Sequence, residues 1–356
     1  MQLLIDKTAA GGRLTPEEGL ALFALDLLTL GRLAHRRRRR LHPEPVVTYV
    51  VDRNINYTNI CVSGCRFCAF YRPPGHPEGY VLPWQELARK LEETRALGGA
   101  GVLLQGGLNP DLTLDFYTDL AAFIRGFGLH LHGFSPPEIV YLAEMSSLGV
   151  VGVLRRLKAA GLGSIPGGGA EILVDRVRRE ISPRKCTTDQ WLAVMETAHG
   201  LGLRTTATMM FGHRETLAER VEHLTHIREL QDRTGGFTAF IPWSFQPGAT
   251  ALGGQAADVV DYLKTLAVSR LFLDNVEHLQ VSWVTQGAKA AQVALAFGAD
   301  DFGSTMIEEN VVAATGVGFR LSREDMVRLI TDAGYTARQR DQIYRVVRDT
   351  GVEPEG

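Results

Sequence analysis

The chain has 356 residues, of which 45% are hydrophobic and 22% are charged. This balance is typical of a globular protein with a large core. The formal net charge of −2 gives no general electrostatic reason to bind nucleic acid. No apolar run approaches the roughly 18 residues needed to cross a bilayer, and the N-terminus lacks the layout of a secretion signal. We therefore expect a cytoplasmic protein without membrane insertion.

A basic region precedes the main domain. Residues 16–35 place apolar side chains at helical spacing and predict a leading helix. Arg36–Arg40 is a run of arginines that could touch phosphate or a membrane, but a solvated linker is the favoured interpretation. His42-Pro43 is expected to join this linker to the main domain. The predicted organisation is 1–46 as helix and linker, 47–320 as one barrel domain, and 321–356 as C-terminal helices packed on it.

Short β-rich runs alternate with helical patterns along the rest of the chain. Strands are predicted over Val47–Val51, Asn56–Ile60, Val102–Gln105, His130–Phe134, Arg204–Phe211, Phe237–Phe245 and His278–Trp283, with another ending near Ser164. Helices are predicted over Trp84–Gly98, Leu114–Phe127, Pro137–Leu148, Val153–Ala160, Asp189–Gly202, Leu217–Arg233, Ala256–Leu273, Ala288–Phe297, Arg323–Asp332 and Ala337–Val347. Such repeated units imply a parallel sheet, and their number favours an α/β fold of (β/α)8 TIM type. Functional groups are then expected at the carboxyl ends of the strands.

Three of the four cysteines lie close together, at Cys61, Cys65 and Cys68, directly after a predicted strand. Thiolates at this spacing suit an iron–sulfur cluster, and three ligands leave one iron of a four-iron cluster open to a substrate or cofactor. A structural zinc site is the alternative; it needs a fourth ligand, for which His76 and Cys186 are candidates. Because the second ligand pair of a typical zinc site is missing, we favour the cluster and expect Cys186 to be a bystander.

The pattern CxxxCxxC after the first barrel strand resembles the signature of the radical S-adenosylmethionine (SAM) superfamily, and Phe67 before the last cysteine also fits it. The resemblance implies a [4Fe–4S] cluster held by Cys61, Cys65 and Cys68, with SAM chelated at the open iron. It also implies cleavage of SAM to methionine and a 5′-deoxyadenosyl radical. A reduced flavodoxin or ferredoxin-type protein is the expected electron donor.

Several segments together resemble the radical SAM enzymes of menaquinone biosynthesis that act on futalosine derivatives. They are VVDRNINYTNIC (50–61), CRFCAFYR (65–72), LLQGGLNP (103–110), LHGFSPPEI (131–139), GLGSIPGGGAEIL (161–173), TTATMMFGH (205–213) and FIPWSFQP (240–247). DRNINYTN and FIPWSFQP favour the cyclising member of this group. The alternatives are aminofutalosine synthase, another radical SAM enzyme that forms a carbon–carbon bond, and, from a different class, a non-catalytic zinc-stabilised barrel.

The resemblance to the cyclising enzyme implies a reaction on dehypoxanthine futalosine. The radical would abstract hydrogen from the ribose C4′ of dehypoxanthine futalosine, and that carbon would add to the benzoate ring of the same substrate. Loss of a proton and an electron would restore the aromatic ring. Such a reaction needs a dry pocket, close positioning of C4′ and an acceptor for the final proton.

Candidate cofactor contacts follow from the same resemblance. Phe67 belongs to the cysteine loop, and Gln105-Gly106-Gly107 ends a strand where the superfamily often has Gly-Gly-Glu. Leu108 replaces that glutamate, so backbone carbonyls or Gln105 would bind the amino group of SAM instead. The alternative for this segment is a plain turn between strand and helix.

Two further strand ends carry candidate SAM contacts. Glu171, after Gly167–Gly169, is expected to bind polar groups of SAM. The alternative is a solvated surface glutamate. Met210 lies in the block TMMFGHRE, which resembles the superfamily's adenine-supporting GxIxGxxE, with Thr208 in place of the first glycine. Core packing is the alternative for Met210, and direct contact of SAM with Glu215 is left open.

The remaining candidates concern the proton and the substrate. His132 shares a strand face with His130 and is a candidate proton acceptor, as is Glu138 in the following loop. Structural roles are the alternative for each of these residues and for the substrate contacts. The candidate substrate contacts are Arg53, Ser135, Gln246, Thr250 and Asp301.

Overall fold

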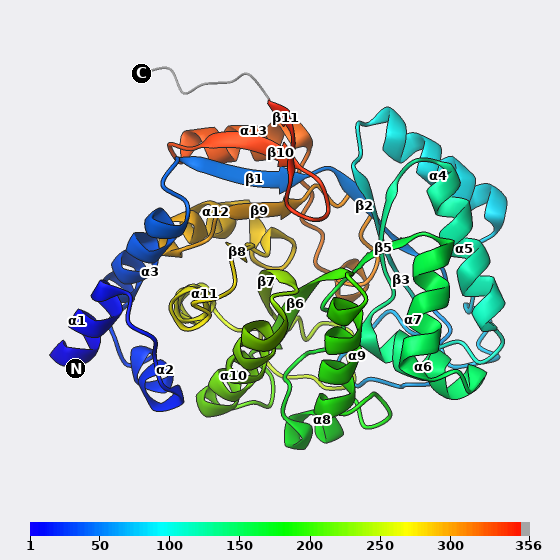
Figure 1. Cartoon of the computed structure of the whole chain (residues 1–356), viewed down its shortest axis with the longest axis horizontal. Helices are drawn as coiled ribbons and strands as arrows, with labels where there is room; N and C mark the ends of the chain where they lie inside the picture. Colours follow the sequence, from blue (N-terminus) through cyan, green and yellow to red (C-terminus); the bar gives the residue numbers. More distant parts are fainter. Residues whose placement is uncertain (350–356) are drawn as a thin grey trace.

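The alternation of strands and helices forms a curled parallel sheet surrounded by helices in the computed structural model, which describes residues 1–349 (Figure 1). Its strands are β1 (Val46–Val50), β2 (Asp52–Asn56), β3 (Gly101–Gln105), β4 (His130–Gly133), β5 (Leu162–Ile165), β6 (Arg204–Phe211), β7 (Phe237–Ser244), β8 (His278–Leu279), β9 (Asp301–Ser304), β10 (Thr336–Arg340) and β11 (Val346–Asp349). Every pair from β2 to β8 is parallel and follows chain order, so each crossover carries helix or loop outside the sheet.

Backbone hydrogen bonds close this sheet into a ring. β1 and β2 are two halves of one bent strand: β2 pairs with β3, whereas β1 pairs with β9. A parallel bridge between Gln280 and Asp301 joins β8 to β9, and Thr305 N donates to Val50 O at 2.9 Å. The predicted TIM-type barrel is therefore confirmed, with β1 and β2 together as its first strand.

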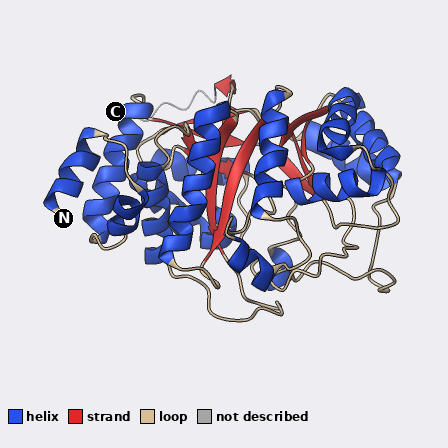
Figure 2. Cartoon of the chain, turned by 60° about the horizontal axis from the view of Figure 1, so that its bottom comes forward, coloured by secondary structure: helices blue, strands red, loops and turns tan. Residues whose placement is uncertain are grey.

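Helices flank the strands on both sides, and long loops gather along the lower edge of the view in Figure 2. The helices are α1 (Gln2–Ala10), α2 (Pro16–Leu22), α3 (Leu27–Leu41), α4 (Trp84–Ala96), α5 (Leu114–Gly126), α6 (Pro136–Ser146), α7 (Gly149–Ala160), α8 (Asp175–Ile181), α9 (Thr188–Gly200), α10 (Leu217–Thr234), α11 (Val259–Phe272), α12 (Trp283–Ala294) and α13 (Arg323–Asp332), with short 3-10 turns at Leu295–Phe297 and Ala313–Thr315. Within residues 1–349 no single helix is long and apolar enough to cross a membrane; the pair α6 and α7 passes that test together but is bent by 108°.

The N-terminal region differs from its prediction. The helix expected over residues 16–35 is interrupted, because the Asp26 side chain caps α3 and starts a new helix there. Arg36–Arg40 lies inside α3, so the linker prediction is wrong. Arg38 is only 1% exposed, and its guanidinium lies 4.4 Å from the centre of the Tyr335 ring. Packing of this helix against the barrel holds the arginine run in a regular conformation.

The C-terminal region also differs. The helix predicted over Ala337–Val347 is wrong, because this segment forms β10 and β11, an antiparallel hairpin beside β1 (Figure 1). β10 pairs in parallel with β1, and this pairing buries Ala337 and Gln339. Tertiary pairing thus overrides the helix preference of Ala, Gln and Arg. The part of the predicted 321–356 segment after residue 349 lies outside the described residues.

Smaller differences concern element ends. The strand predicted over Asn56–Ile60 ends at Asn56, and the residues after it make only isolated bridges. The strand predicted over His278–Trp283 is short because α12 already begins at Trp283. The sequence pattern also missed α8, which places a short helix directly after the triple-glycine segment. These shifts leave the cysteine loop and Gln105 at the carboxyl ends of the strands, whereas Arg53 and Asp301 lie near the amino ends of β2 and β9.

Candidate active site at the carboxyl ends of the strands

The cysteine loop folds over the ends of β2 and β3. Cys61 N donates to Arg72 O at 2.9 Å, and Leu108 N lies 3.3 Å from Cys61 Sγ. The Ser63 hydroxyl lies 2.9 Å from Cys61 Sγ and 3.3 Å from Cys65 Sγ, so two of the three thiols face the same small space. Burial raises the pKa of Cys65 to about 11. The Cys65 thiol would therefore release its proton when a metal group binds.

Sulfur spacing distinguishes a cluster from a single ion. In the described residues, one set of three histidine, cysteine or carboxylate ligand atoms lies within 4.8 Å, and it contains no cysteine. Thiolates around one tetrahedral zinc lie about 3.8 Å apart, given a Zn–S bond of about 2.3 Å. The three cysteine sulfurs therefore do not all lie within 4.8 Å of one another, and such a spread fits a [4Fe–4S] cluster, in which each thiolate binds a separate iron. The residues present therefore fit the cluster better than zinc.

Glycines allow this loop to approach the strands closely. A Cβ on Gly107 would overlap Ile60 O and lie 2.8 Å from Cys61 Cβ. A Cβ on Gly106 would overlap the ring of Tyr57, and one on Gly168 would overlap the amide of Gln105. The predicted Gln105-Gly106-Gly107 edge thus lies between the cysteine loop and the triple-glycine segment.

A buried ion pair borders the cysteine loop. Glu171 has φ +42° and is 5% exposed; its Oε1 accepts from Lys185 Nζ at 3.0 Å, while its Oε2 has no hydrogen-bond partner among the described residues. Lys185 Nζ also lies 5.1 Å from the centre of the Phe67 ring. Burial opposes the charge of Lys185, but neighbouring Cys65 and Glu171 raise its pKa overall. Glu171 Oε2 also lies 3.7 Å from Arg178 Nη1, so the buried carboxylate is held between two cations.

The barrel encloses a cavity of about 260 Å³. Polar side chains from β2, β3, β4 and β6 line one side of it: Asn54, Gln105, His132, Thr206 and Thr208. β7 and the segments after β8 and β9 contribute most of the apolar lining, together with polar side chains: the apolar residues are Ile241, Trp243, Val281, Trp283, Val284, Met306, Val311 and Val312, and the polar ones are Gln280, Ser282, Thr285 and Glu309. Glu171 also lines this cavity, which therefore connects the cofactor end to an amphipathic chamber.

His132 is a neutral group on the polar side of this chamber. Its Nδ1 and the Nε2 of His130 each lie 2.7 Å from the Ser164 hydroxyl. Its own Nε2 has no partner among the described residues. Burial lowers the pKa of His132 to about 3. The structure brings this predicted residue to the cavity as an uncharged hydrogen-bonding group.

Glu138 and Ser135 are placed differently. They form a capping box at the start of α6, in which Ser135 N and Oγ donate to Glu138 Oε2. Glu138 Oε1 accepts from Tyr57 Oη at 2.7 Å and from Gly106 N at 3.2 Å. Neither residue lines the cavity. Both therefore hold the Gly106 edge in place rather than facing a ligand.

Arg53 and Asp301 both form ion pairs with other side chains of the chain. Arg53 points out of the barrel, where it pairs with Glu93 at 2.9 Å and Glu308 at 3.3 Å. Both oxygens of Asp301 accept from the Arg340 guanidinium. Neither residue lines the cavity, so the structure does not bring these two predicted substrate contacts to the site.

The remaining predicted residues, Gln246, Thr250 and Met210, do not line the cavity. Gln246 Nε2 donates to the Ser244 hydroxyl at 3.0 Å, and Thr250 Oγ1 donates to Pro247 O at 2.8 Å. Their loop touches the cysteine loop, since Leu252 N donates to Arg66 O. Met210 is buried in the core and does not line the cavity.

Two other predictions concern the turn after β6 and the fourth cysteine. Glu215 accepts from Gly212 N and His213 N and so orders this turn. Cys186 is buried, with its sulfur 3.6 Å from an Arg178 guanidinium nitrogen.

A lysine and two tryptophans at the site were not predicted from the sequence. Lys185 gave no signal, because a lone lysine in a polar stretch is typical of a surface. Trp243 and Trp283 lie in apolar strand and helix patterns that core packing explains equally well. Their inward direction depends on the barrel register, which no local pattern specifies.

This chain is similar to known proteins over almost its whole length. Residues 55–227 match the family model described as the radical SAM superfamily, and residues 234–352 match the CofH/MqnC C-terminal region. A cyclic dehypoxanthine futalosine synthase from Halalkalibacterium halodurans is 45% identical over 97% of this chain and 94% of its own. A 5-amino-6-(D-ribitylamino)uracil–L-tyrosine 4-hydroxyphenyl transferase from Methanopyrus kandleri is 39% identical over 97% and 96%.

Solved structures support the fold. The hydrogenase maturase HydG from Carboxydothermus hydrogenoformans has a TM-score of 0.77 at 18% identity, covering 95% of this chain and 79% of its own. Methylornithine synthase (PylB) has a TM-score of 0.74 at 18% identity, covering 93% and 96%. Together with the thiol loop and the enclosed cavity, these matches show that the chain is an enzyme of the radical SAM superfamily, in the family with a CofH/MqnC C-terminal region.

Proposed function

We propose that this enzyme converts dehypoxanthine futalosine to cyclic dehypoxanthine futalosine in menaquinone biosynthesis. The ribose C4′ loses hydrogen and becomes bonded to the benzoate ring, which then loses a proton and an electron. The amphipathic cavity below the cysteine loop is the observation that carries the proposal. Its polar side suits a ribose, and its side with Trp243 and Trp283 suits an aromatic ring.

The chain's own residues bind and orient the reactants. Cys61, Cys65 and Cys68 would hold a [4Fe–4S] cluster, which together with SAM supplies a 5′-deoxyadenosyl radical when bound. The Glu171 carboxylate, which lines the cavity, would bind a polar group of SAM, and the Gln105-Gly106-Gly107 edge would receive its methionine part. The apolar wall would keep water from the reacting carbons. Reducing equivalents would come from a flavodoxin or ferredoxin-type donor.

His132 is our candidate for the final proton. It lines the cavity, and its Nε2 has no partner among the described residues. Its low pKa makes it a weak base. The ring proton to be lost is strongly acidic once the adduct has given up its electron, so a weak base suffices. Glu138, the other candidate, has hydrogen bonds at both oxygens.

The test is a product assay. The anaerobically reconstituted enzyme is incubated with reductant, SAM and dehypoxanthine futalosine, and products are identified by mass spectrometry. The expected result is a product lighter than the substrate by two hydrogens, formed together with 5′-deoxyadenosine. 5′-Deoxyadenosine without that product would contradict the proposed substrate.

A parallel incubation separates the related activities. It supplies tyrosine with 5-amino-6-(D-ribitylamino)uracil, the reactants named for the Methanopyrus kandleri relative. A third supplies the aminofutalosine synthase substrate. Product in either incubation, with none from dehypoxanthine futalosine, would replace the proposed reaction by that activity.

A further inference from the structure

The turn between β10 and β11 enters the amino end of the barrel. β10 runs parallel to β1, with Tyr49 opposite Gln339, so the turn begins where β1 passes into β2. Gln342 is 6% exposed and donates to the Asp52 carboxylate from inside the barrel. A Cβ on Gly101, the first residue of β3, would lie 3.0 Å from the Gln342 side chain. The turn is therefore packed between strands rather than lying on the surface.

A stack of flat side chains anchors this turn. The Arg340 guanidinium lies 3.7 Å from the centre of the Tyr344 ring, and Tyr344 lies parallel to His278 at 4.3 Å. His278 in turn stacks on His42 at 5.2 Å, which reaches the segment before β1. Tyr344 Oη also hydrogen-bonds Gln280 Oε1 at 3.3 Å. Groups from three distant parts of the chain thus form one continuous layer across this end.

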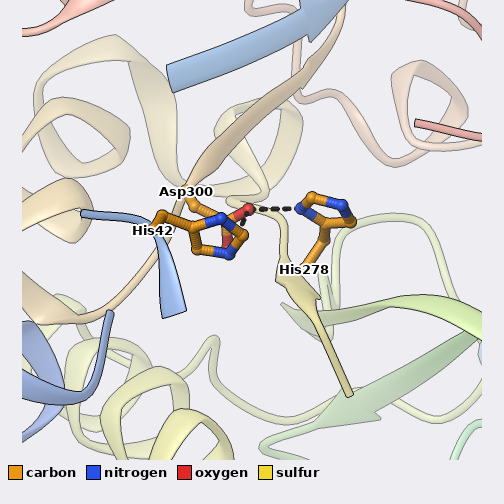
Figure 3. A group of neighbouring side chains, drawn as sticks. All are labelled: His42, His278 and Asp300. Carbon is orange, nitrogen blue, oxygen red and sulfur yellow. Dashed lines mark hydrogen bonds and ion pairs between the residues drawn. The ribbon is translucent and has the colours of Figure 1, made fainter. Parts of the chain in front are cut away.

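Ion pairs with Asp300 fix His42 and His278 within that layer. Figure 3 shows Asp300 between His42 and His278, with its Oδ2 2.6 Å from His278 Nδ1. The other oxygen accepts from Arg270 and from Leu279 N. The carboxylate is thus already balanced by a buried guanidinium, so we assign these side chains to closure of the barrel and not to a metal.

The turn residues of the layer border the cavity. Arg340, Gln342 and Tyr344 line the same chamber as Gln105, His132 and Glu171. The cysteine loop covers the carboxyl ends of the strands, so the turn lies at the opposite end of the chamber. A polar group of the substrate that points away from the cysteine loop would meet the amide of Gln342.

We propose that residues Arg340–Tyr344 form a plug that closes the amino end of the barrel and serves as the floor of the substrate cavity. The plug sets how far the substrate enters and keeps water from the reacting carbons. Its role as a floor rests on the proposed function. Its role in closure rests on packing alone, so the two are tested separately.

Closure is tested on the protein without added substrate by hydrogen–deuterium exchange. Tyr344→Ala removes the centre of the stack, and Gln342→Ala removes the contact with Asp52. Both should speed amide exchange at least tenfold in peptides that contain β3 and β8. The matched control is Arg345→Ala, because this exposed side chain beside the plug bonds only Asp341 among the described residues. Its exchange should stay within twofold of wild type.

The floor is tested by the ratio of 5′-deoxyadenosine to cyclised product. Tyr344→Ala and Gln342→Ala should raise this ratio at least fivefold, since a poorly placed substrate wastes cleavage events. Tyr344→Phe keeps the stack and should restore coupling to within twofold of wild type. If Tyr344→Ala fails to fold or to bind iron, Gln342→Ala decides alone.

Two results would overturn the proposal. Unchanged exchange in both alanine variants would remove the closing role, and an unchanged product ratio would remove the floor. Wild-type enzyme that forms no cyclised product would instead contradict the proposed function. The exchange experiment would then still decide whether the plug closes the barrel.

Discussion

At the scale of single residues, the proposed site depends on three thiols and on the Glu171 carboxylate. The loop supplies three cysteine ligands and no spare one. Cys61→Ala, Cys65→Ala and Cys68→Ala should therefore each lose the cluster. Iron per chain and visible absorbance after anaerobic reconstitution measure this. Cys186→Ala is the control, since its buried sulfur lies beside Arg178. Loss of iron in that variant would show that the ligand assignment is wrong.

Glu171 offers a second test at this scale. Glu171→Gln should weaken SAM binding about ten- to hundredfold, because a hydrogen bond to a charged group is worth about 1.5–3 kcal/mol. Iron content should not change, since Glu171 is not a cluster ligand. Calorimetric titration of the reconstituted protein with SAM measures the effect. Glu196→Gln, which alters an exposed carboxylate paired with Arg233, should bind SAM as wild type does. Equal affinity in both variants would remove Glu171 from the cofactor site.

At the scale of elements, close approach of the cysteine loop to β3 is the critical feature. Gly107→Ala should destabilise the fold by about 1–3 kcal/mol and lower iron incorporation, because the new methyl group overlaps Ile60 O. Gly126→Ala is the matched control at the end of α5, where no atom lies within 4 Å of an added Cβ. It should add up to about 1 kcal/mol of stability. Urea unfolding measures both, and equal stabilities would contradict the proposed packing.

Element prediction succeeded where a pattern is local and failed where pairing is distant. The limits of β6 and α13 agree with their predictions, because a long buried strand and a capped amphipathic helix carry their own periodicity. The segment Ala337–Val347 has good helix formers, yet it pairs with β1 far away in the sequence. Arg36–Arg40 lacks apolar periodicity and is nevertheless helical through packing.

At the scale of the whole molecule, buried neutral histidines tie stability to pH. His223 is fully buried, its Nδ1 accepts from Leu173 N at 2.9 Å, and burial lowers its pKa to about 3. The unfolded chain binds a proton at this site below about pH 6.5, whereas the folded chain does not. Stability from His223 is therefore present above about pH 6.5 and is lost as the pH falls towards 3.

Denaturant unfolding between pH 6 and pH 4 tests this linkage. Each such histidine should contribute about 1.4 kcal/mol per pH unit to the loss of unfolding free energy. His223→Gln should be less stable at neutral pH but show a shallower slope by that amount. An unchanged slope would mean that His223 is protonated alike in both states.

The sequence by itself determined the thiol loop, the barrel class and the strand ends that carry Gln105, His132 and Glu171. The thiol loop and the strand and helix pattern depend on residue spacing within one turn, one strand or one helix, whereas the cofactor roles of Gln105 and Glu171 were implied by the family resemblance. Only the tertiary structure decided that Lys185 pairs with Glu171, that Arg53 points away from the cavity, and that Gln342 meets Asp52 from 290 positions away. The reason is physical: which side chains share the barrel interior depends on strand register and ring closure, and these depend on pairings between residues that are distant in the chain.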